Sequence, residues 1–254
     1  MVEPILRAER LTKRFGGLAA VADVSLELHL GQVHAVIGPN GAGKSTLTNL
    51  LSGDLTPTSG QIHYAGLDLA GLSPERISRL GVGRSYQKTN IFLAFTVLEN
   101  CRLAAQSRQQ RPWQVWRSAD AYDDINAAAK DAVQAVGLYD RRMLVASALS
   151  HGEQRQLEIA MCLATRPRVL LMDEPLAGMG PQEAQGIIAL IQRLTSGHAI
   201  MLIEHDMDAV FAVAQRLTVM VNGEVIASDT PQAVRASPIV QQAYLGDEHG
   251  ALDV

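Results

Sequence analysis

The stretch Gly38-Pro-Asn-Gly-Ala-Gly-Lys44-Ser45 decides the fold class of this chain, because it satisfies every required position of the pattern G-x-x-x-x-G-K-[ST]. The residues Gln32–Ile37 predict an apolar strand directly before it, and Lys44–Leu51 predicts a helix directly after it. Glycine-rich loops that hold phosphate groups occur in this strand–loop–helix context. A chance glycine turn followed by a lysine is the alternative, and the flanking elements argue against it.

Each residue type in this phosphate loop has a chemical reason to be there. Gly41 and Gly43 let the backbone turn and bring several N–H groups onto the phosphates. The following helix points its positive end at the same anion, Lys44 adds a cation on the β and γ oxygens, and Ser45 offers a hydroxyl to Mg²⁺. The loop therefore predicts Mg-ATP binding. The residues expected to contact the nucleotide here are Gly38, Pro39, Asn40, Gly41, Ala42, Gly43, Lys44, Ser45 and Thr46.

A second motif, Val169-Leu-Leu-Met-Asp173-Glu174, places two carboxylates at the end of a predicted buried strand. Ligands of open α/β sheets bind at the carboxyl ends of the strands. We expect Asp173 to hold Mg²⁺ through water and Glu174 to polarise the water that attacks the γ-phosphate. Taken alone, the motif also fits a strand that runs into an exposed acidic turn, and the upstream glycine loop favours the catalytic interpretation.

The composition is that of an ordinary soluble globular protein, with 47% apolar and 19% charged residues among 254. The formal net charge of -4 predicts no general affinity for nucleic acid. The two cysteines are far apart and favour a reducing, cytosolic compartment. Neither a signal peptide nor an apolar run of the ~20 residues that span a bilayer is expected, so a membrane role would be peripheral.

The hydrophobic pattern predicts a mainly parallel α/β core over residues 1–90 and 164–230. Val24–Leu30 alternates apolar and polar residues, which is typical of a half-buried antiparallel strand. Asn222-Gly223 lies between two apolar segments and predicts a hairpin. Further strands are expected over Gln61–Tyr64, Arg168–Met172, Ala199–Ile203 and Leu217–Val221, and further helices over Pro74–Leu80, Pro181–Leu194 and Asp206–Ala214.

A helical insertion is expected over residues 91–163, and a short helical tail over 231–254. The insertion contains helix-forming segments at Thr96–Gln106, Ala121–Val136 and Ser150–Thr165. Its stretch Gln109–Ser118 contains Trp113 and Trp116, three residues apart. We expect these two rings to pack on the helical insertion, and contact with another protein is the alternative.

The segment Leu149-Ser-His-Gly-Glu-Gln154 identifies the kind of ATPase, because here the sequence resembles the ATP-binding cassette family and its LSGGQ-like signature. His151 stands in place of the first glycine and Glu153 in place of the glutamine. The resemblance implies that Ser150, Gly152 and Gln154 bind ATP held by the opposite subunit. A helix start is itself an anion site. Ser150 with Glu153 also fits a plain capping box, and both interpretations can hold together.

The other elements of the family follow in order, and each implies a role by resemblance. Gln87, in Arg84-Ser-Tyr-Gln87, matches the glutamine that contacts Mg²⁺ or water where the core joins the helical lobe. His205, in Ile203-Glu-His-Asp206, matches the switch histidine. Phe15 matches the aromatic residue that stacks on adenine, although an aromatic residue there fits a core position equally well. Catalysis is thus expected to involve Glu174, His205, Gln87 and Lys44, and the metal to involve Ser45, Gln87 and Asp173.

One departure concerns the segment after Pro175, where the family usually has Ser-Ala-Leu-Asp and this chain has Leu176-Ala-Gly-Met-Gly180. Gly180 replaces the aspartate that would couple the two nucleotide sites. The resemblance nevertheless covers about Leu6 to Gly246. It implies a P-loop NTPase fold in a single nucleotide-binding domain, with a RecA-like mixed-sheet core, an antiparallel β subdomain and an inserted α-helical subdomain.

Several segments are similar to the ATPases of branched-chain and hydrophobic amino-acid importers, among them Ile203-Glu-His-Asp-Met207 and Ala243-Tyr-Leu-Gly246. The resemblance implies ATP-driven uptake, with urea, amide and aromatic-acid import as alternatives. The implied partners are a second ATPase subunit (a copy or a paralogue), two membrane permease subunits near Gln87–Phe92 and, indirectly, a solute-binding protein. The implied location is the cytoplasmic face of the inner membrane.

Non-transport members of the family are disfavoured by this sequence. Cassette ATPases of DNA repair carry a long coiled-coil insertion, and residues 91–163 show no sustained heptads. Cassette proteins of translation carry two cassettes and a basic linker, whereas this chain has one cassette and is mildly acidic. A non-hydrolysing structural module is expected to lack Glu174 or His205, and both are present.

Overall fold

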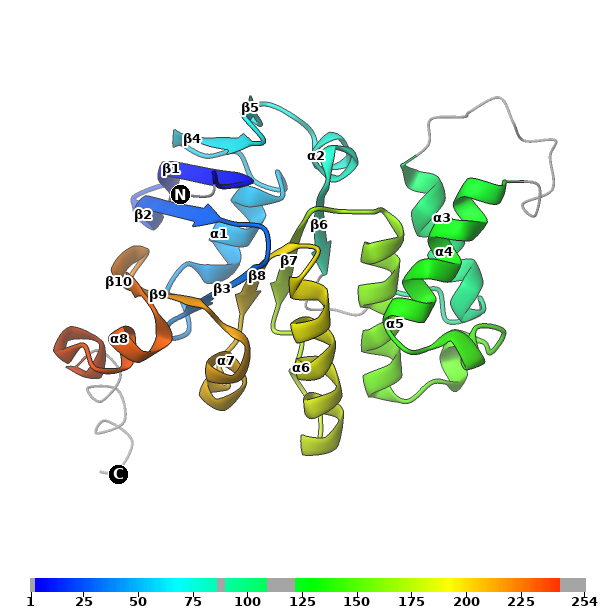
Figure 1. The fold of residues 1–254 in the computed structure, drawn as a ribbon. Helices are drawn as coiled ribbons and strands as arrows, with labels where there is room; N and C mark the ends of the chain where they lie inside the picture. Colours follow the sequence, from blue (N-terminus) through cyan, green and yellow to red (C-terminus); the bar gives the residue numbers. More distant parts are fainter. Residues whose placement is uncertain (1–2, 86–89, 109–121, 243–254) are drawn as a thin grey trace.

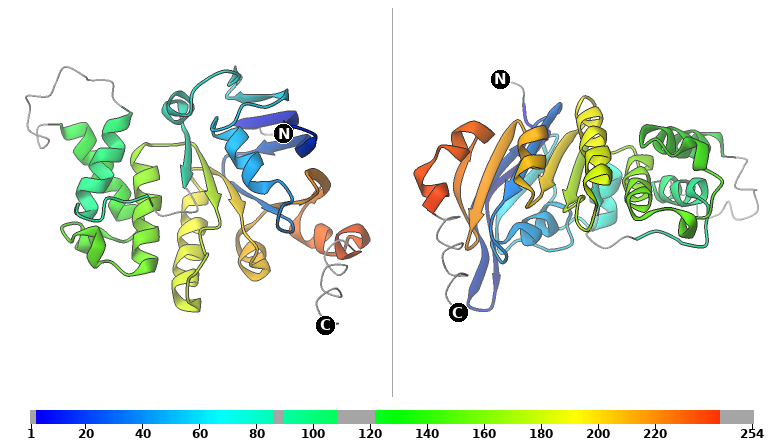
Figure 2. Two further views of the ribbon diagram at one scale, coloured as in Figure 1. Left: turned by 180° about the vertical axis from the view of Figure 1, so that it is seen from behind. Right: turned by 90° about the horizontal axis from the view of Figure 1, so that it is seen from below.

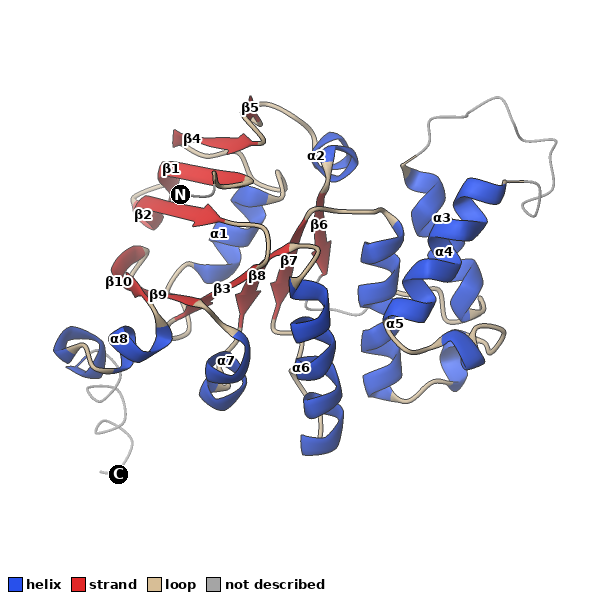
Figure 3. Ribbon diagram, in the orientation of Figure 1, coloured by secondary structure: helices blue, strands red, loops and turns tan. Residues whose placement is uncertain are grey.

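Two sheets and an outlying group of helices make up the fold of this computed structural model, which describes residues 3–85, 90–108 and 122–242 (Figures 1 and 3). The strands are β1 (Leu6–Phe15), β2 (Leu18–Leu28), β3 (Gln32–Ile37), β4 (Ser59–Tyr64), β5 (Leu67–Asp68), β6 (Val82–Ser85), β7 (Val169–Asp173), β8 (Ala199–Ile203), β9 (Arg216–Val221) and β10 (Glu224–Asp229). The helices are α1 (Lys44–Leu51), α2 (Pro74–Leu80), α3 (Val97–Ser107), α4 (Asp123–Ala135), α5 (His151–Ala164), α6 (Pro181–Thr195), α7 (Met207–Val213) and α8 (Pro231–Arg235).

The larger sheet has the strand order β10-β9-β3-β8-β7-β6, and its strands are parallel except for β10 at one edge. Strand β8 and the first four residues of β7 are apolar, and every residue in both strands is buried. The smaller sheet is antiparallel, in the order β2-β1-β4-β5. The mixed core and the separate antiparallel sheet confirm the predicted fold class.

Helix α1 lies between the two sheets (Figure 1). Its side chains Leu47, Leu50 and Leu51 are fully buried among residues of both sheets. Helices α6 and α7 cover the opposite face of the larger sheet, where Ile187 and Leu190 pack against apolar residues of β7 and β8. This three-layer packing fixes α1, and with it the loop that precedes α1, at one end of the sheet.

Helices α3, α4 and α5 pack on one another at the side of the larger sheet, at the far end from α8 (Figure 2). Helix α3 begins with a capping box formed by Thr96 and Glu99. The fully buried Asn100 accepts the N–H of Phe92 at 2.8 Å and donates to the carbonyl of Phe92 at 3.1 Å. These bonds fix the chain where it enters the helical group. The predicted segment Gln109–Ser118, with both tryptophans, lies outside the described residues.

Candidate nucleotide-binding site

The phosphate loop runs from the end of β3 to the start of α1, as predicted, and two of its glycines have no room for a side chain. A Cβ on Gly43, whose φ is +98°, would lie 2.2 Å from the carbonyl oxygen of Ala20. A Cβ on Gly38 would lie 2.1 Å from the carbonyl oxygen of Met220. The loop is therefore held between β2 and β9, in a conformation that requires glycine.

The helix that follows the loop begins without a side-chain cap. Its N-cap residue is Gly43, and its first turn contains no acidic residue. The first N–H groups of a helix lack partners within the helix, and they carry its positive partial charge. Backbone donors in the turn of the loop add to them, so this end of α1 offers a set of N–H groups to an anion. The exposed hydroxyl of Ser45 lies at the same helix start.

Lys44 folds back over the loop, where its Nζ donates to the carbonyl oxygens of Gly38 at 2.6 Å and Pro39 at 3.0 Å. Burial lowers the pKa of Lys44, while the nearby carboxylates of Glu174 and Asp173 raise it. The structure thus brings Lys44 together with the two carboxylates of the second motif. Because a lysine ammonium is a mobile point charge, it can turn from these carbonyls to phosphate oxygens without a backbone change.

Asp173 is the last residue of β7, and only 4% of it is exposed. Burial raises the pKa of its carboxyl group, and the Arg84 guanidinium, with Nη2 3.8 Å from Oδ2, lowers it. Arg84 comes from the neighbouring strand β6 and also bonds the side chains of Asp54 at 2.6 Å and Ser52 at 2.9 Å. No motif in the sequence pointed to Arg84, yet its contacts fix the surroundings of the predicted metal carboxylate.

Glu174 follows Asp173 with a φ of +48°, an unfavourable conformation for a residue with a side chain. Its N–H donates to the carbonyl oxygen of Ile203, the last residue of β8, at 2.9 Å. His205 follows the same strand, and its side chain is 71% exposed. The predicted base and the predicted switch histidine therefore leave the sheet from neighbouring strand ends, as expected for a site at the carboxyl edge.

Glu204, between Ile203 and His205, was given no role by the sequence analysis. It is 1% exposed, and its carboxylate accepts the N–H groups of Leu176 at 2.8 Å and His205 at 3.2 Å. Burial raises the pKa of Glu204, and these two hydrogen bonds lower it. The residue ties the loop after Glu174 to the loop that carries His205. A charged residue directly after five apolar strand residues is the sequence signal that could have revealed it.

Phe15, predicted to stack on adenine, lies at the end of β1 and is 49% exposed. The Nζ of Lys13 lies 5.3 Å from the centre of its ring. The ring belongs to the β1–β2 hairpin, and the following strand contains Ala20, whose carbonyl oxygen lies against Gly43. An exposed aromatic face at this place is available to a flat ligand. Gln87, the remaining predicted residue of this half-site, lies outside the described residues.

The signature segment forms the start of α5, and several of its polar groups are hydrogen-bonded within its own chain. Ser150 is the N-cap and forms a capping box with Glu153. The N–H of Gly152 donates to the carboxylate of Glu183, at the start of α6, at 3.1 Å. The side-chain amide of Gln154 donates to the carbonyls of Ala146 and Leu149 at 3.3 and 3.4 Å. Across the described ranges, no hydrogen bond or ion pair joins this segment to the phosphate loop.

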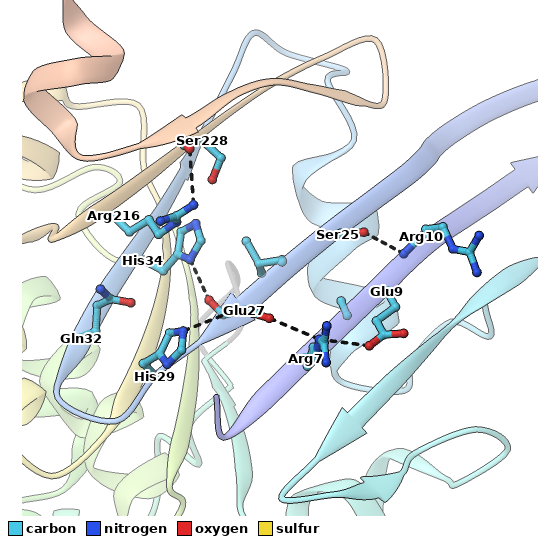
Figure 4. A pocket seen from close by; sticks show the side chains of 12 residues that line it. Arg7, Glu9, Arg10, Ser25, Glu27, His29, Gln32, His34, Arg216 and Ser228 are labelled. Carbon is cyan, nitrogen blue, oxygen red and sulfur yellow. Dashed lines mark hydrogen bonds and ion pairs between the residues drawn. The ribbon is translucent and has the colours of Figure 1, made fainter. Parts of the chain in front are cut away.

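An open hollow of about 490 Å³ lies at the other end of the larger sheet, near the starts of β3 and β9 (Figure 4). Its charged groups pair with one another, since Arg7 lies 3.0 Å from Glu9 and 3.2 Å from Glu27. Burial lowers the pKa of His34 to about 4, and the neutral ring bonds the Glu27 carbonyl and the Thr218 hydroxyl. The hollow is therefore distinct from the phosphate site.

The comparisons with known proteins agree with this geometry. The sequence profile of the ABC transporter family matches residues 21–177, and the profile of the branched-chain amino acid ATP-binding cassette transporter matches residues 224–250. The chain belongs to the ABC transporter family, as an ATP-binding cassette. This confirms the resemblance on which the sequence analysis relied.

Two relatives align along nearly the whole chain. The high-affinity branched-chain amino acid transport ATP-binding protein LivG of Salmonella typhimurium is 40% identical over 255 residues, covering 97% of this chain and 100% of that protein. The corresponding protein BraF of Pseudomonas aeruginosa is 39% identical over 257 residues, with the same coverage.

Solved structures of cassettes share the fold. A nucleotide-free ATP-binding cassette from an ABC transporter has a TM-score of 0.84 at 30% identity, covering 95% of this chain and 99% of that one. A cassette in its ADP conformation has a TM-score of 0.85 at 30% identity, covering 96% and 100%. Within the described residues, no helix is long and apolar enough to cross a membrane.

Proposed function

We propose that this chain is the ATP-hydrolysing subunit of an importer of branched-chain amino acids. The observation that carries the proposal is the joint placement of the uncapped start of α1, the Asp173–Glu174 pair and His205 at one edge of one sheet. The solute is inferred from the relatives, which are named for branched-chain amino acid transport and align along their whole length.

Magnesium fits the donors at this edge. The described residues hold no cluster of three or more His, Cys, Asp or Glu side chains that could bind a metal. Mg²⁺ keeps several waters and is usually bound by one or two protein oxygens together with substrate phosphates. The Ser45 hydroxyl and the Asp173 carboxylate are such oxygens, and Gln87 is proposed to join them. The ion supplies positive charge to the phosphate oxygens.

The protein side chains then have separate tasks in hydrolysis. Lys44 exchanges the carbonyls of Gly38 and Pro39 for phosphate oxygens, where its charge stabilises the transferred group. Glu174 accepts the proton of the attacking water. His205, on its exposed loop, contacts the γ-phosphate and fixes its orientation.

A second subunit completes each site. The signature of α5 forms no hydrogen bond to the phosphate loop of its own chain within the described ranges, although both are anion-binding helix starts. We propose that Ser150 and Gly152 contact the γ-phosphate of ATP held by a second cassette, either a copy of this chain or a paralogue. In that arrangement two ATP molecules lie between two cassettes.

The proposed contact with the membrane permease is an exposed apolar patch on the helical group. Phe92 and Phe95 stack with ring centres 5.4 Å apart and are 49% and 43% exposed. Leu93, between the two phenylalanines in sequence, is also exposed. Met143 and Leu144 are exposed as well, and the N–H of Val97 donates to the carbonyl of Leu144, which brings them to the start of α3. Apolar side chains gathered on a surface mark interaction sites. The proposed location is therefore the cytoplasmic face of the membrane, with residues 91–163 as the docking lobe.

The test is reconstitution of this chain in proteoliposomes with the branched-chain amino acid permease subunits and solute-binding protein of the same organism. ATP-dependent uptake of labelled leucine, isoleucine and valine is expected, and a matched preparation with Lys44→Ala should show none. Uptake of urea, an amide or an aromatic acid instead would agree with the role as an importer ATPase but would overturn the proposed solute. Absence of any ATP-dependent uptake in an assembled complex would contradict the importer role itself.

A further inference from the structure

One buried arginine connects the signature helix to the catalytic loop of the same chain. Arg155 lies in the second turn of α5 and is 5% exposed. Its Nη2 donates to the carbonyl oxygens of Asp173 and Glu174, each at 3.0 Å, and its Nε donates to that of Pro175 at 3.3 Å. A single guanidinium thus binds three successive carbonyls, which only the forked shape of arginine permits.

The positive charge of Arg155 is paired with a buried carboxylate on the same helix. Nη1 of Arg155 donates to the carboxylate of Glu158, one turn further along α5 and 5% exposed. A buried charge without a partner is strongly destabilising, whereas a buried pair with satisfied hydrogen bonds is tolerated. Glu158 is therefore the counter-ion that allows Arg155 to stay charged beneath the catalytic loop.

Glu174, whose carbonyl Arg155 binds, has an unfavourable backbone conformation. Its φ is +48°, which is unfavourable for a residue with a Cβ. Its N–H is bound by the carbonyl of Ile203, and its C=O is bound by Arg155. With both peptide groups fixed, the direction in which the Glu174 side chain leaves the backbone is fixed as well.

We propose that Arg155 is a positioning residue for the catalytic carboxylate Glu174, acting through the three carbonyls of Asp173, Glu174 and Pro175. The inference rests on the proposed ATPase function and adds a residue to which the family resemblance gave no role. Arg155 acts on the backbone of the catalytic loop through these carbonyls. Because it belongs to the helix that starts with Ser150 and Gly152, a shift of that helix moves the backbone of the catalytic loop.

The test compares three variants of the full-length chain. Arg155→Lys keeps the charge but can no longer bind three carbonyls. The double change Arg155→Met with Glu158→Leu removes both buried charges and replaces them by apolar side chains of similar volume, which preserves folding when the single change does not. The matched control is Arg108→Lys, since Arg108 donates to the carbonyls of Thr165 and Arg166 just past the other end of α5.

Two measurements separate positioning from general damage. We expect kcat for ATP to fall at least tenfold in both Arg155 variants, while the affinity for ATP changes less than about threefold, because the phosphate loop is untouched. Hydrogen exchange at the amides of Glu174 and Leu176 should become faster, with no change in the peptides of α1. The Arg108→Lys control should match the parent in both measurements.

The outcomes distinguish this inference from the proposed function. An unchanged kcat and unchanged exchange at Glu174 in a folded Arg155 variant would overturn the positioning role. Equal losses of kcat and of ATP affinity would also overturn it, because they would place the effect at the phosphate loop. A parent chain without ATPase activity in the complex with its second cassette and the permease would contradict the proposed function alone, and the exchange measurement would still decide whether Arg155 holds the loop.

Discussion

The starts of α1 and α5 are both predicted anion sites, but they differ in the hydrogen-bond partners that their own chain gives them. Helix α1 begins at Gly43, without a side-chain cap and without an acidic residue in its first turn. Helix α5 begins at Ser150 with a capping box, and the N–H of Gly152 is bound by the carboxylate of Glu183. One helix start is open to a phosphate group, and the other is satisfied by carboxylates.

In the proposed two-subunit site, this difference gives the two helix starts different tasks. A helix start with unbound donors can bind an anion directly, so we expect the isolated chain to bind ATP at α1. A helix start that holds Glu183 binds a phosphate only by displacing a carboxylate, which demands that the nucleotide be held in place by a second cassette. The isolated chain should therefore bind ATP better than it hydrolyses it.

The largest effect should come from Glu174→Gln, which leaves the α1 site intact and removes the base. Because a positioned general base contributes about 10²–10⁴-fold, we expect kcat to fall about a thousandfold while ATP binding is retained. Steady-state ATPase assays with equilibrium binding of a fluorescent ATP analogue measure both. Glu224→Gln, an exposed change in β10, serves as the control. Full activity in Glu174→Gln would exclude Glu174 as the base.

The next largest effect should come from Lys44→Ala, which removes the cation of the phosphate loop at the start of α1. Hydrogen bonds to a charged group contribute about 1.5–3 kcal/mol, so the affinity for ATP should fall about 10- to 100-fold. Isothermal titration of the dilute chain measures it, and Lys130→Ala on the exposed face of α4 should change nothing. An unchanged affinity would show that the phosphate loop binds no nucleotide.

A smaller effect is expected from Ser150→Ala, on the α5 side. The lost N-cap should lower the free energy of unfolding by about 1 kcal/mol. ATP affinity of the dilute chain should not change, whereas ATPase activity at high protein concentration should fall several-fold. Denaturant unfolding and activity at several concentrations check these results. A loss of affinity in the dilute chain, as in Lys44→Ala, would mean that Ser150 serves its own site.

The smallest effect is expected from Glu183→Gln, which changes the carboxylate that accepts the Gly152 N–H at the start of α5. A neutral amide oxygen holds the Gly152 N–H less strongly than a carboxylate does, and it does not repel an incoming phosphate. We expect the KM for ATP at high protein concentration to fall about threefold. Glu75→Gln, which changes an exposed carboxylate at the start of α2, is the matched control. A raised KM would show that the Glu183 carboxylate helps the signature segment to bind ATP and does not compete with the phosphate for the Gly152 N–H.

The phosphate loop and the helix cap at Ser150 were predictable from the sequence, because glycine loops and helix caps depend on residues close together in the chain. The glycine pattern located the phosphate loop, and Ser150 with Glu153 predicted the capping box that α5 forms. Strands β3 and β8 and helices α1 and α2 have the predicted bounds. The alternation of Val24–Leu30 correctly predicted an antiparallel strand, although β2 spans Leu18–Leu28.

The strands that the sequence did not predict have irregular patterns. Strand β1 contains Arg10 with a φ of +47° and several register shifts against β2, so its side chains do not alternate regularly. Strand β6 is four residues long and includes a glycine. The contacts of Glu183, Glu204 and Arg155 were hidden for another reason, because they join elements distant in the chain. No single-sequence pattern reports such pairs.

The neighbours of the phosphate loop bear on how the chain folds during synthesis. The N–H of Gly223, in the β9–β10 turn, donates to the carbonyl of Ala42 at 3.1 Å, and its own carbonyl accepts the N–H of Ala22 at 2.9 Å. Three segments, the outermost of which are 201 residues apart in sequence, thus meet at one turn. A ribosome must complete most of the protein before its most recognisable motif can take its final shape, and a fragment ending before Gly223 should contain the whole pattern and yet bind ATP poorly.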